Sequence, residues 1–383
     1  MGQRAGIDVV RGHGRLVGEK LVSVTAGDGT ARTLYARHAV VLATGTTASV
    51  PAVPGLAAAA PWTSRDVTGL REVPRRVAVI GGGVVACEAT TWLHGLGAEE
   101  VTIIEPASAL LAKQEPFAGT LLAEHFEQLG ITVLTGTPLD RVERPVVART
   151  GLGRVHGGPA TLSAGGRIIE VDEIVVATGR TPASGDIGLD VVGVDISGSH
   201  GFVTVDDHLG VAGVAGEWLY AVGDLCGRAL LTHMGKYQGR IAGDVIAARA
   251  EGRPLDGPRF ADIADHDMVP AVVFTDPQVA SVGLTEAAAK SKGVDVEVLE
   301  YDLASVAGAA LTRPGYKGRA KLVVDRSAGT LVGATFVGAD VAELLHSATM
   351  AIVGKLTLDT LWHVVPSYPT ISEVWLRLLE SRR

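Results

Sequence analysis

The chain lacks two cysteines close enough in sequence to form a redox disulfide. Its 383 residues include two cysteines, Cys87 and Cys226, which lie 139 positions apart. Because redox dithiols usually occur in C-x-x-C or similarly short motifs, we do not expect this chain to carry one. Cys87 is predicted to be a small packing residue, whereas Cys226, in the run GDLCGRA, is predicted to be exposed near a cofactor.

Other scarce features exclude further classes of protein. No apolar run approaches the roughly 18–20 residues that a membrane span needs. The net charge is −8 and no cluster of lysine or arginine is present, which argues against a nucleic-acid partner. The first residues, MGQRAGIDVVRG, contain no apolar core of a signal peptide. These observations predict a cytoplasmic protein that binds neither membrane nor nucleic acid.

Glycine and apolar residues are abundant. The chain has 49 glycines and 47% hydrophobic residues, against 20% charged and 4% aromatic residues. This composition is typical of an α/β protein with many tight turns. A single hydrophobic core rarely serves a chain of this length, so two or three domains are expected.

A glycine-rich turn within residues 77–105, VAVIGGGVVACEATTWLHGLGAEEVTIIE, is the most informative feature. The apolar run Val77–Ile80 predicts a buried parallel strand, and the glycines predict a tight turn into a helix. Free N–H groups at such a helix N-terminus attract a pyrophosphate. The alternative is a structural turn that binds no phosphate. The candidate cofactor-binding residues of this G-x-G-x-x-G/A fingerprint are Gly81, Gly82, Gly83, Val84, Val85 and Ala86.

The acidic residue after the next strand indicates which dinucleotide is bound. A second apolar run, Val101–Ile104, ends in Glu105, 24 residues after Gly81. A carboxylate at this point accepts hydrogen bonds from ribose hydroxyls and repels a 2′-phosphate. No arginine lies beside it in the run EPASALL. Glu105 therefore favours NAD over NADP.

A coarse internal repeat indicates two nucleotide-binding folds. Residues 39–51, AVVLATGTTASVP, and residues 173–184, EIVVATGRTPAS, each predict a strand, a glycine turn and a proline-marked loop. Coincidence between two buried strands is the alternative. Residues 5–36 predict a small antiparallel β segment. From Pro270 onward the pattern predicts an antiparallel sheet with flanking helices, an α+β module.

Asp224 ends another short predicted strand, in the run WLYAVGDLCGR, and a predicted helix follows. An aspartate at the carboxyl end of a parallel strand is well placed to bind a polyol hydroxyl of a cofactor. The alternative is that Asp224 caps the N-terminus of the following helix.

Together these motifs resemble the pyridine nucleotide–disulfide oxidoreductase family, which includes dihydrolipoamide dehydrogenase, mercuric reductase, glutathione reductase and soluble transhydrogenase. The resemblance covers essentially the whole chain in family order. The motifs that carry it are LATGT (42–46), VIGGGVVACE (79–88), IIE (103–105), VATGR (176–180), YAVGD (220–224), LLTH (230–233), FTDPQVASVG (274–283) and SYPTISE (367–373).

The resemblance implies an α/β fold of two nucleotide-binding domains of the FAD/NAD-linked reductase type, the first truncated at its N-terminus, with a C-terminal α+β dimerisation domain. It also implies a homodimer in which the C-terminus of one subunit closes the flavin site of the other. The predicted boundaries are 1–74 for a partial FAD-binding domain, 75–182 for the NAD-binding domain, 183–261 for the return of the FAD-binding domain and 262–383 for the dimerisation domain.

The family pattern also implies which residues contact the cofactors FAD and NAD(H). The implied FAD contacts are Gly14, Thr44, Gly45, Thr46, Asp224, Leu230, Leu231, Thr232 and His233. The implied NAD contacts are Gly81, Gly83, Val84, Glu88, Glu105 and Gly179. No catalytic residue and no metal ligand is assigned.

The chain differs from the family pattern at its beginning. Family members start with a strand, a G-x-G-x-x-G turn and a helix that bind the ADP half of FAD, and a redox C-x₄-C follows. This sequence starts in the β segment after them. Because the first strand of a doubly wound sheet is central, its absence would leave unpaired backbone groups. We therefore expect a flavin domain less stable than that of its relatives.

A second difference lies near the C-terminus. The family signature ends His-Pro-Thr-x-x-Glu, in which the histidine relays a proton and the glutamate orients it. Here the run is Tyr368-Pro369-Thr370-Ile371-Ser372-Glu373, so the glutamate is kept and tyrosine replaces the histidine. Tyrosine, with a pKa near 10, is a poor general base at pH 7. The alternative is that Tyr368 packs near the flavin with a hydrogen-bonded hydroxyl group.

The leading functional hypothesis is an FAD-dependent NAD(P)H oxidoreductase that passes hydride from nicotinamide to flavin and then electrons to a small, non-thiol acceptor. A quinone, a dye-like acceptor or a second nicotinamide would qualify. One alternative is a disulfide or metal reductase resembling dihydrolipoamide dehydrogenase or mercuric reductase, with its dithiol in a missing N-terminal segment. Another is a flavin-free, NAD-binding dimer without catalysis.

Overall fold

The computed structural model describes residues 6–382, so the expectations for residues 1–5 lie outside the described part. The chain forms two compact units, one made of residues up to 47 together with 180–266, the other of 48–179 together with 267–383. Each unit is described separately below. The domain boundaries expected at 74, 182 and 261 stay predictions.

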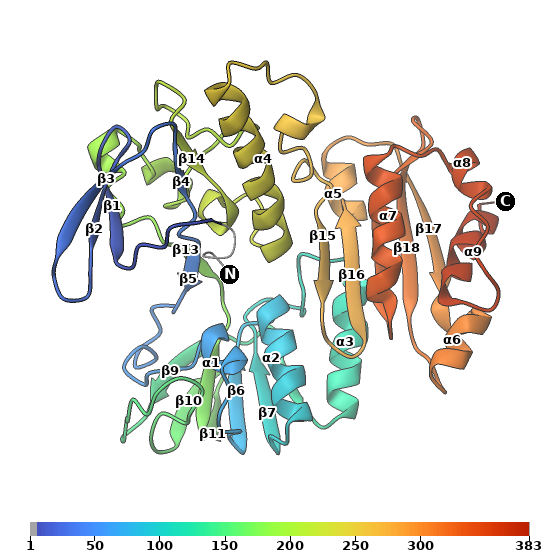
Figure 1. The fold of residues 1–383 in the computed structure, drawn as a ribbon. Helices are drawn as coiled ribbons and strands as arrows, with labels where there is room; N and C mark the ends of the chain where they lie inside the picture. The colour runs from blue at the N-terminus through green and yellow to red at the C-terminus, as the bar shows by residue number, and fades with distance from the viewer. Residues whose placement is uncertain (1–5, 383) are drawn as a thin grey trace. The chain divides into compact units, whose positions relative to one another are not determined.

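A four-stranded parallel sheet forms the first half of the larger unit (Figure 1). Its strands, in spatial order, are β12 (Glu173–Val176), β6 (Arg76–Ile80), β7 (Glu100–Ile104) and β8 (Thr132–Leu134). The apolar runs of the central strands are buried on both faces, which is typical of parallel sheets. Helix α2 (Val84–Gly95) connects β6 to β7, and α3 (Pro116–Gln128) connects β7 to β8. The strand, turn, helix and strand predicted within residues 77–105 are confirmed.

A smaller antiparallel sheet accompanies the parallel sheet. It consists of β9 (Leu139–Glu143), β10 (Ala160–Ala164) and β11 (Arg167–Val171), with β10 in the middle. A fully buried ion pair joins the chain just after β9 to the first residue of β12, because Arg144 Nη2 lies 2.8 Å from Glu173 Oε1. Arg144 also donates to the carbonyl oxygens of Ala59 and Asp172. These bonds fix the small sheet against the parallel one.

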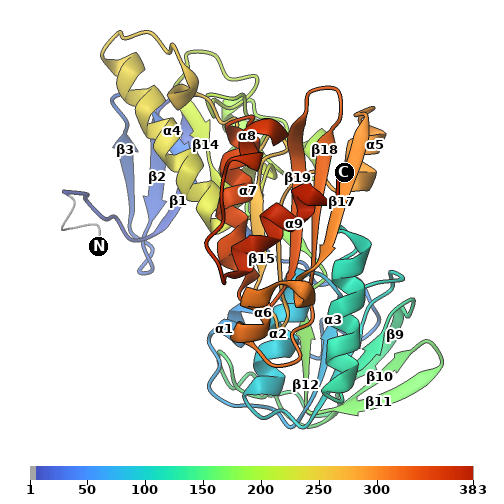
Figure 2. The ribbon, with the colours of Figure 1, turned by 90° about the vertical axis from the view of Figure 1, so that its right-hand side faces the viewer.

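The C-terminal part of the same unit is a five-stranded antiparallel sheet covered by helices (Figure 2). Its order is β15 (Pro270–Val273), β16 (Gln278–Gly283), β19 (Thr330–Gly338), β18 (Arg319–Asp325) and β17 (Val296–Asp302). Helix α7 (Leu344–Val353) packs on β16 and β19, and α9 (Val374–Glu380) packs on β17 and β18. Val273, Val279 and Val337 pack into the core beside the four-stranded parallel sheet, so the two parts share apolar packing. The α+β module predicted from Pro270 is confirmed.

The smaller unit contains three short sheets and one long helix. An antiparallel sheet of β1 (His13–Gly18), β2 (Leu21–Thr25) and β3 (Ala31–Tyr35) confirms the predicted β segment. Two parallel strands, β4 (Val40–Leu42) and β14 (Leu219–Ala221), pair with each other, as do β5 (Thr46–Ala48) and β13 (Arg180–Pro182). Helix α4 (Thr232–Ala250) packs on the turn after β14.

The remaining helices are short, and no helix in residues 6–382 is long and apolar enough to cross a membrane. They are α1 (Ser64–Thr68), α5 (Glu286–Ser291), α6 (Ala307–Thr312) and α8 (Leu358–Trp362).

The buried pair predicts a large effect on stability. Replacing Arg144 by methionine leaves the Glu173 carboxylate buried without its cation, and burial already raises the pKa of Glu173. We expect Arg144→Met to lower the free energy of unfolding by about 3–5 kcal/mol, as measured by urea denaturation. Arg141→Met is the matched control, because Arg141 pairs with Glu143 on the exposed face of β9. It should leave stability close to wild type; equal losses in the two variants would contradict the role assigned to the buried pair.

Candidate functional site

The glycine turn after β6 is closely packed on one side and open on the other. Gly81 has φ +113°, and a Cβ there would lie 2.6 Å from the carbonyl oxygen of Ala177. A Cβ on Gly82 would lie 2.8 Å from Cγ of Glu105. Gly83, the N-cap of α2, has no heavy atom within 4 Å of the corresponding position. The packing around Gly81 and Gly82 therefore leaves no room for a side chain, whereas Gly83 leaves space at the N-terminus of α2.

Helix α2 turns one face into the core and presents its first turn to that space. Ala86 is fully buried, as the third small position of the fingerprint requires, whereas Val84 is 38% exposed and Val85 half-buried. Glu88 lies one turn further along, and its Oε1 accepts a hydrogen bond of 2.9 Å from the backbone N–H of Phe274. Burial raises the pKa of Glu88.

The other residues predicted to contact NAD lie at the carboxyl ends of the neighbouring strands. Glu105 follows β7, and its Oε1 accepts a hydrogen bond of 2.6 Å from the N–H of Ala107. Gly179 follows β12 with φ +154°, and its carbonyl oxygen accepts from the N–H of Ser49. Because β12, β6 and β7 are adjacent, the structure brings together residues that are nearly 100 positions apart in sequence. This edge can hold a dinucleotide, with its pyrophosphate at α2 and its ribose at Glu105.

The smaller unit contains the residues predicted to contact FAD. The Thr46 hydroxyl donates to Asp224 Oδ2 over 2.8 Å and accepts from Arg180 Nε. The Thr44 hydroxyl donates to the carbonyl oxygen of Ala183, and Gly45 has φ +70°. Arg180 was not among the predicted site residues, although it directly follows the predicted Gly179. These bonds place Asp224, in the turn after β14, beside Thr46, the first residue of β5.

Asp224 does not cap helix α4, so that alternative is wrong. The N-cap of α4 is Leu231, whose side chain makes no capping hydrogen bond, and the helix begins at Thr232. Leu230 is 39% exposed, and His233 lies in the first turn. The uncapped N-terminus of α4 can hold an anionic group. Gly14, the remaining predicted FAD contact, lies in β1 and thus in a different sheet from Thr46 and Asp224.

A buried polar network that the sequence did not reveal holds the turn before Asp224. The side chain of Gln238, on α4, accepts from the N–H of Gly223 over 2.7 Å and donates to Asp262 Oδ2 over 2.9 Å. Burial raises the pKa of Asp262.

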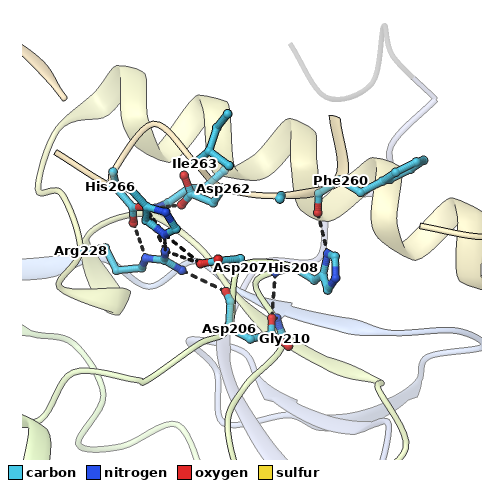
Figure 3. A network of polar contacts seen from close by, with 12 residues as sticks. Asp206, Asp207, His208, Gly210, Arg228, Phe260, Asp262, Ile263 and His266 are labelled. Carbon is cyan, nitrogen blue, oxygen red and sulfur yellow. Dashed lines mark hydrogen bonds and ion pairs between the residues drawn. The ribbon is translucent and has the colours of Figure 1, made fainter. Parts of the chain in front are cut away.

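Charged residues extend this network outward (Figure 3). Arg228 pairs with Asp207 and Asp265, and His266 lies beside them. Within residues 6–382 no group of three or more histidine, cysteine, aspartate or glutamate side chains is arranged to hold a metal ion. The bonds of Arg228 to Asp207 and Asp265 hold the segment that contains Asp265 and His266 against the turn at Asp207.

The exposure predicted for Cys226 is wrong. Cys226 is 7% exposed and packs in an apolar cluster beside Leu225, because the 3-10 turn after β14 directs both side chains inward. Burial raises the pKa of the Cys226 thiol to about 12. Cys87 is fully buried, as expected, and burial raises its pKa to about 12 as well.

The C-terminal signature lacks a proton-relay pair. Tyr368 is 76% exposed, so packing within this chain does not account for it. Glu373 is buried, and its Oε1 accepts a hydrogen bond of 2.6 Å from Arg377 Nη2. The glutamate that orients a histidine in the family pattern is thus ion-paired with an arginine one helical turn away.

Two family models match the chain. The model described as pyridine nucleotide-disulphide oxidoreductase matches residues 1–250. The model of the dimerisation domain of the same family matches residues 269–378.

Individual proteins resemble the chain over almost its whole length. A dihydrolipoyl dehydrogenase of Chlorobaculum tepidum is 34% identical over 97% of this chain and 74% of its own length. A mercuric reductase of Bacillus cereus is 30% identical over 96% of this chain and 54% of its own length. Among solved structures, flavoprotein disulfide reductase RclA of Escherichia coli has a TM-score of 0.83 at 23% identity, covering 98% of this chain and 79% of its own. LpdA of Mycobacterium tuberculosis has a TM-score of 0.80 at 24% identity, covering 100% of this chain and 78% of its own. At these identities the two structures show the fold alone.

The open position at Gly83 gives a direct test of the dinucleotide site. A methyl group at Gly83 contacts no protein atom but fills space at the N-terminus of α2. We expect Gly83→Ala to keep the wild-type melting temperature and to weaken NADH binding about tenfold or more, measured by fluorescence titration. Gly95→Ala is the control, since Gly95 is equally open at the other end of the same helix. NADH affinity unchanged by Gly83→Ala would place the ligand elsewhere.

Proposed function

The chain belongs to the pyridine nucleotide-disulphide oxidoreductase family, and we propose that it uses FAD and NADH to reduce an acceptor that is not a disulfide. Membership makes it an FAD-dependent NAD(P)H oxidoreductase. When bound, FAD supplies a flavin that takes a hydride from reduced nicotinamide and returns electrons to an acceptor. The chain's own residues bind and orient the cofactors.

The dinucleotide edge of the larger unit fits NADH. The space at Gly83 accommodates a pyrophosphate where N–H groups at the start of α2 are uncapped by any side chain. Glu105 stands at the ribose position, where its charge disfavours a 2′-phosphate. Gly179, in the turn after β12, and Glu88, one turn into α2, complete the edge. The proposed NAD contacts are thus those expected from the sequence.

The residues of the smaller unit fit the polyol and phosphate portions of FAD. Asp224 and Thr46 can share hydrogen bonds with polyol hydroxyl groups, because their side-chain oxygens lie 2.8 Å apart and each can bond a hydroxyl group. Helix α4 begins at Thr232, and its N-cap residue Leu231 makes no side-chain capping bond, so backbone N–H groups of the first turn can face a phosphate. Thr44 and Gly45 shape the turn beside them.

One observation favours a non-thiol acceptor: neither thiol of this chain can serve as a nucleophile at neutral pH. Cys87 and Cys226 are buried, with pKa values raised to about 12. Thiol exchange requires an accessible thiolate. Tyrosine also stands where the family pattern has the histidine of the proton relay, and Glu373 is ion-paired with Arg377, so no histidine–glutamate pair is present at this position. A quinone, a dye-like acceptor or a second nicotinamide accepts electrons without these groups.

A homodimer is supported by the match of residues 269–378 to the family's dimerisation domain. We propose that the C-terminal segment around Tyr368 then lies against the partner subunit. Its exposure in the single chain agrees with this, since Tyr368 and Val365 are 76% and 84% exposed.

The names of the relatives support a second candidate. The matched proteins are a dihydrolipoyl dehydrogenase, a mercuric reductase and a glutathione reductase, at 30–34% identity. A disulfide or metal reductase would need a redox dithiol in addition to the two buried thiols described above. The two candidates differ in which acceptor is reduced.

The experiment is to purify the chain, record its visible spectrum and then add NADH without oxygen. We expect a flavin band near ~450 nm that NADH bleaches, followed by turnover with a substituted benzoquinone but not with lipoamide or oxidised glutathione. Cys226→Ala should turn over at the wild-type rate, because that thiol takes no part.

Two other results would contradict the proposed function, and each would support a different candidate. Turnover with lipoamide and none with the quinone would favour the disulfide reductase. A colourless protein that still binds NADH would indicate a flavin-free dinucleotide-binding dimer.

A further inference from the structure

A buried ion pair links the C-terminal sheet to the dinucleotide part of the larger unit. Lys321, in the middle of β18, is 5% exposed, and Glu115, the N-cap of α3, is 2% exposed. Lys321 Nζ lies 2.8 Å from Glu115 Oε2. Burying two charges is unfavourable unless geometry and further hydrogen bonds offset the lost hydration. The stability of this pair therefore depends on the further hydrogen bonds that its charged atoms make.

Every charged atom of the pair has a partner. Glu115 Oε1 accepts a hydrogen bond of 2.6 Å from the N–H of Glu286, and Lys321 Nζ also lies 2.5 Å from Glu286 Oε2. Burial by itself would lower the pKa of Lys321, but hydrogen bonds to Glu115 and Glu286 outweigh it and raise the pKa. The pKa of Glu286 falls to about 2 through its bonds with Lys290 and Lys321. Lys321 and Glu286 are therefore ionised at neutral pH.

Although Glu115 occupies the N-cap position of α3, its side chain does not cap that helix. It makes no side-chain hydrogen bond to the first turn of α3, and its carboxylate points to β18 and α5 instead. The pair thus anchors the start of α3 to the C-terminal sheet.

The first turn of α3 packs directly against residues 106–114, the segment that precedes it. A Cβ on Gly119 would lie 2.1 Å from the carbonyl oxygen of Leu110, so the helix and residues 106–114 are in direct backbone contact. Leu110 and Leu111 are buried. A shift of the N-terminus of α3 cannot leave this segment in place.

The same segment holds both parts of the dinucleotide edge. The N–H of Leu111 donates to the carbonyl oxygen of Gly82 over 2.8 Å. The N–H of Ala107 donates to Glu105 Oε1, and Leu110 Cδ2 lies 3.0 Å from the Cβ position of Gly82. Residues 106–114 therefore fix both the glycine turn and the carboxylate at the ribose position.

We propose that Lys321 is a positioning residue for NADH binding, acting through Glu115 and the 106–114 segment on Gly82 and Glu105. The proposal rests on the dinucleotide edge proposed above. It assigns to a residue of the C-terminal sheet a role in the affinity of a site that it does not touch. The physical requirement is that the buried pair sets the position of α3, as the contacts from Gly119 to Gly82 indicate.

The test compares NADH dissociation constants by fluorescence titration of the full chain. Lys321→Met removes the buried cation, and we expect about a tenfold weaker affinity for NADH. Lys290→Met is the matched control: it also removes a cation bonded to Glu286, but one that is 61% exposed. It should bind NADH as the wild type does.

The double variant Glu115→Gln with Lys321→Met separates positioning from stability. The double variant removes both the Lys321 cation and the Glu115 carboxylate, so no unpaired charge stays buried. Its melting temperature should therefore be higher than that of Lys321→Met. Its NADH affinity should stay low because the anchor is still missing. This variant also keeps the test decisive if Lys321→Met does not fold.

Several results would overturn the proposal. These are wild-type affinity in either folded Lys321 variant, an equal loss in Lys290→Met, or a wild-type chain that binds no NADH. The readout is NADH binding alone, so a wrong assignment of the electron acceptor would not affect it.

Discussion

The close approach of backbone to backbone at the turn after β6 is the constraint on which the dinucleotide edge depends. Gly81 stands against the carbonyl oxygen of Ala177, and Gly82 stands against the side chain of Glu105. Because β12, β6 and β7 are neighbours in one sheet, a side chain at either glycine would push apart the ends of these strands. The positions of Gly179 and Glu105 are therefore set by the same steric limit. Gly83 differs, since its Cβ position is open and no packing contact requires a glycine there.

Buried charge supports this arrangement at two places. Arg144 and Glu173 join the small antiparallel sheet to β12, and Lys321 and Glu115 join the C-terminal sheet to α3. Each pair lies where one sheet meets another element, and each has further hydrogen-bond partners: the carbonyl oxygens of Ala59 and Asp172 for Arg144, and Glu286 for Lys321 and Glu115. Apolar packing tolerates small slips of one surface over another, whereas a buried ion pair loses much of its energy when its atoms move apart. In this chain such pairs fix the relative placement of modules whose edges form the site.

The sequence predicted the elements of the dinucleotide edge because their signals are local. The run Val77–Ile80, the glycine turn and Glu105 follow one another within one strand–helix–strand unit, so a single pattern covers them. Contacts between segments that are far apart in the sequence leave no local pattern from which they could be predicted. The bond from Leu111 to Gly82 and the bond from Gln238 to Asp262 depend on which surfaces meet in the fold.

The error at Cys226 has the same origin. Closeness to Asp224 in sequence does not place the thiol near a cofactor, because the 3-10 turn after β14 directs it into the apolar cluster with Leu225. A local pattern does not state the direction of a side chain in an irregular turn. Backbone geometry decides it.

Sharing a scaffold with disulfide reductases does not fix the electron acceptor. Dinucleotide binding depends on the backbone of a turn and one carboxylate, which tolerate wide divergence elsewhere, whereas the acceptor half-reaction depends on a few side chains. In this chain tyrosine stands at position 368, where the family pattern has a histidine, and Glu373 is ion-paired with Arg377. A histidine restored at Tyr368 would meet a glutamate that has one oxygen already bonded to Arg377, one helical turn away, so the orienting carboxylate differs from a free one.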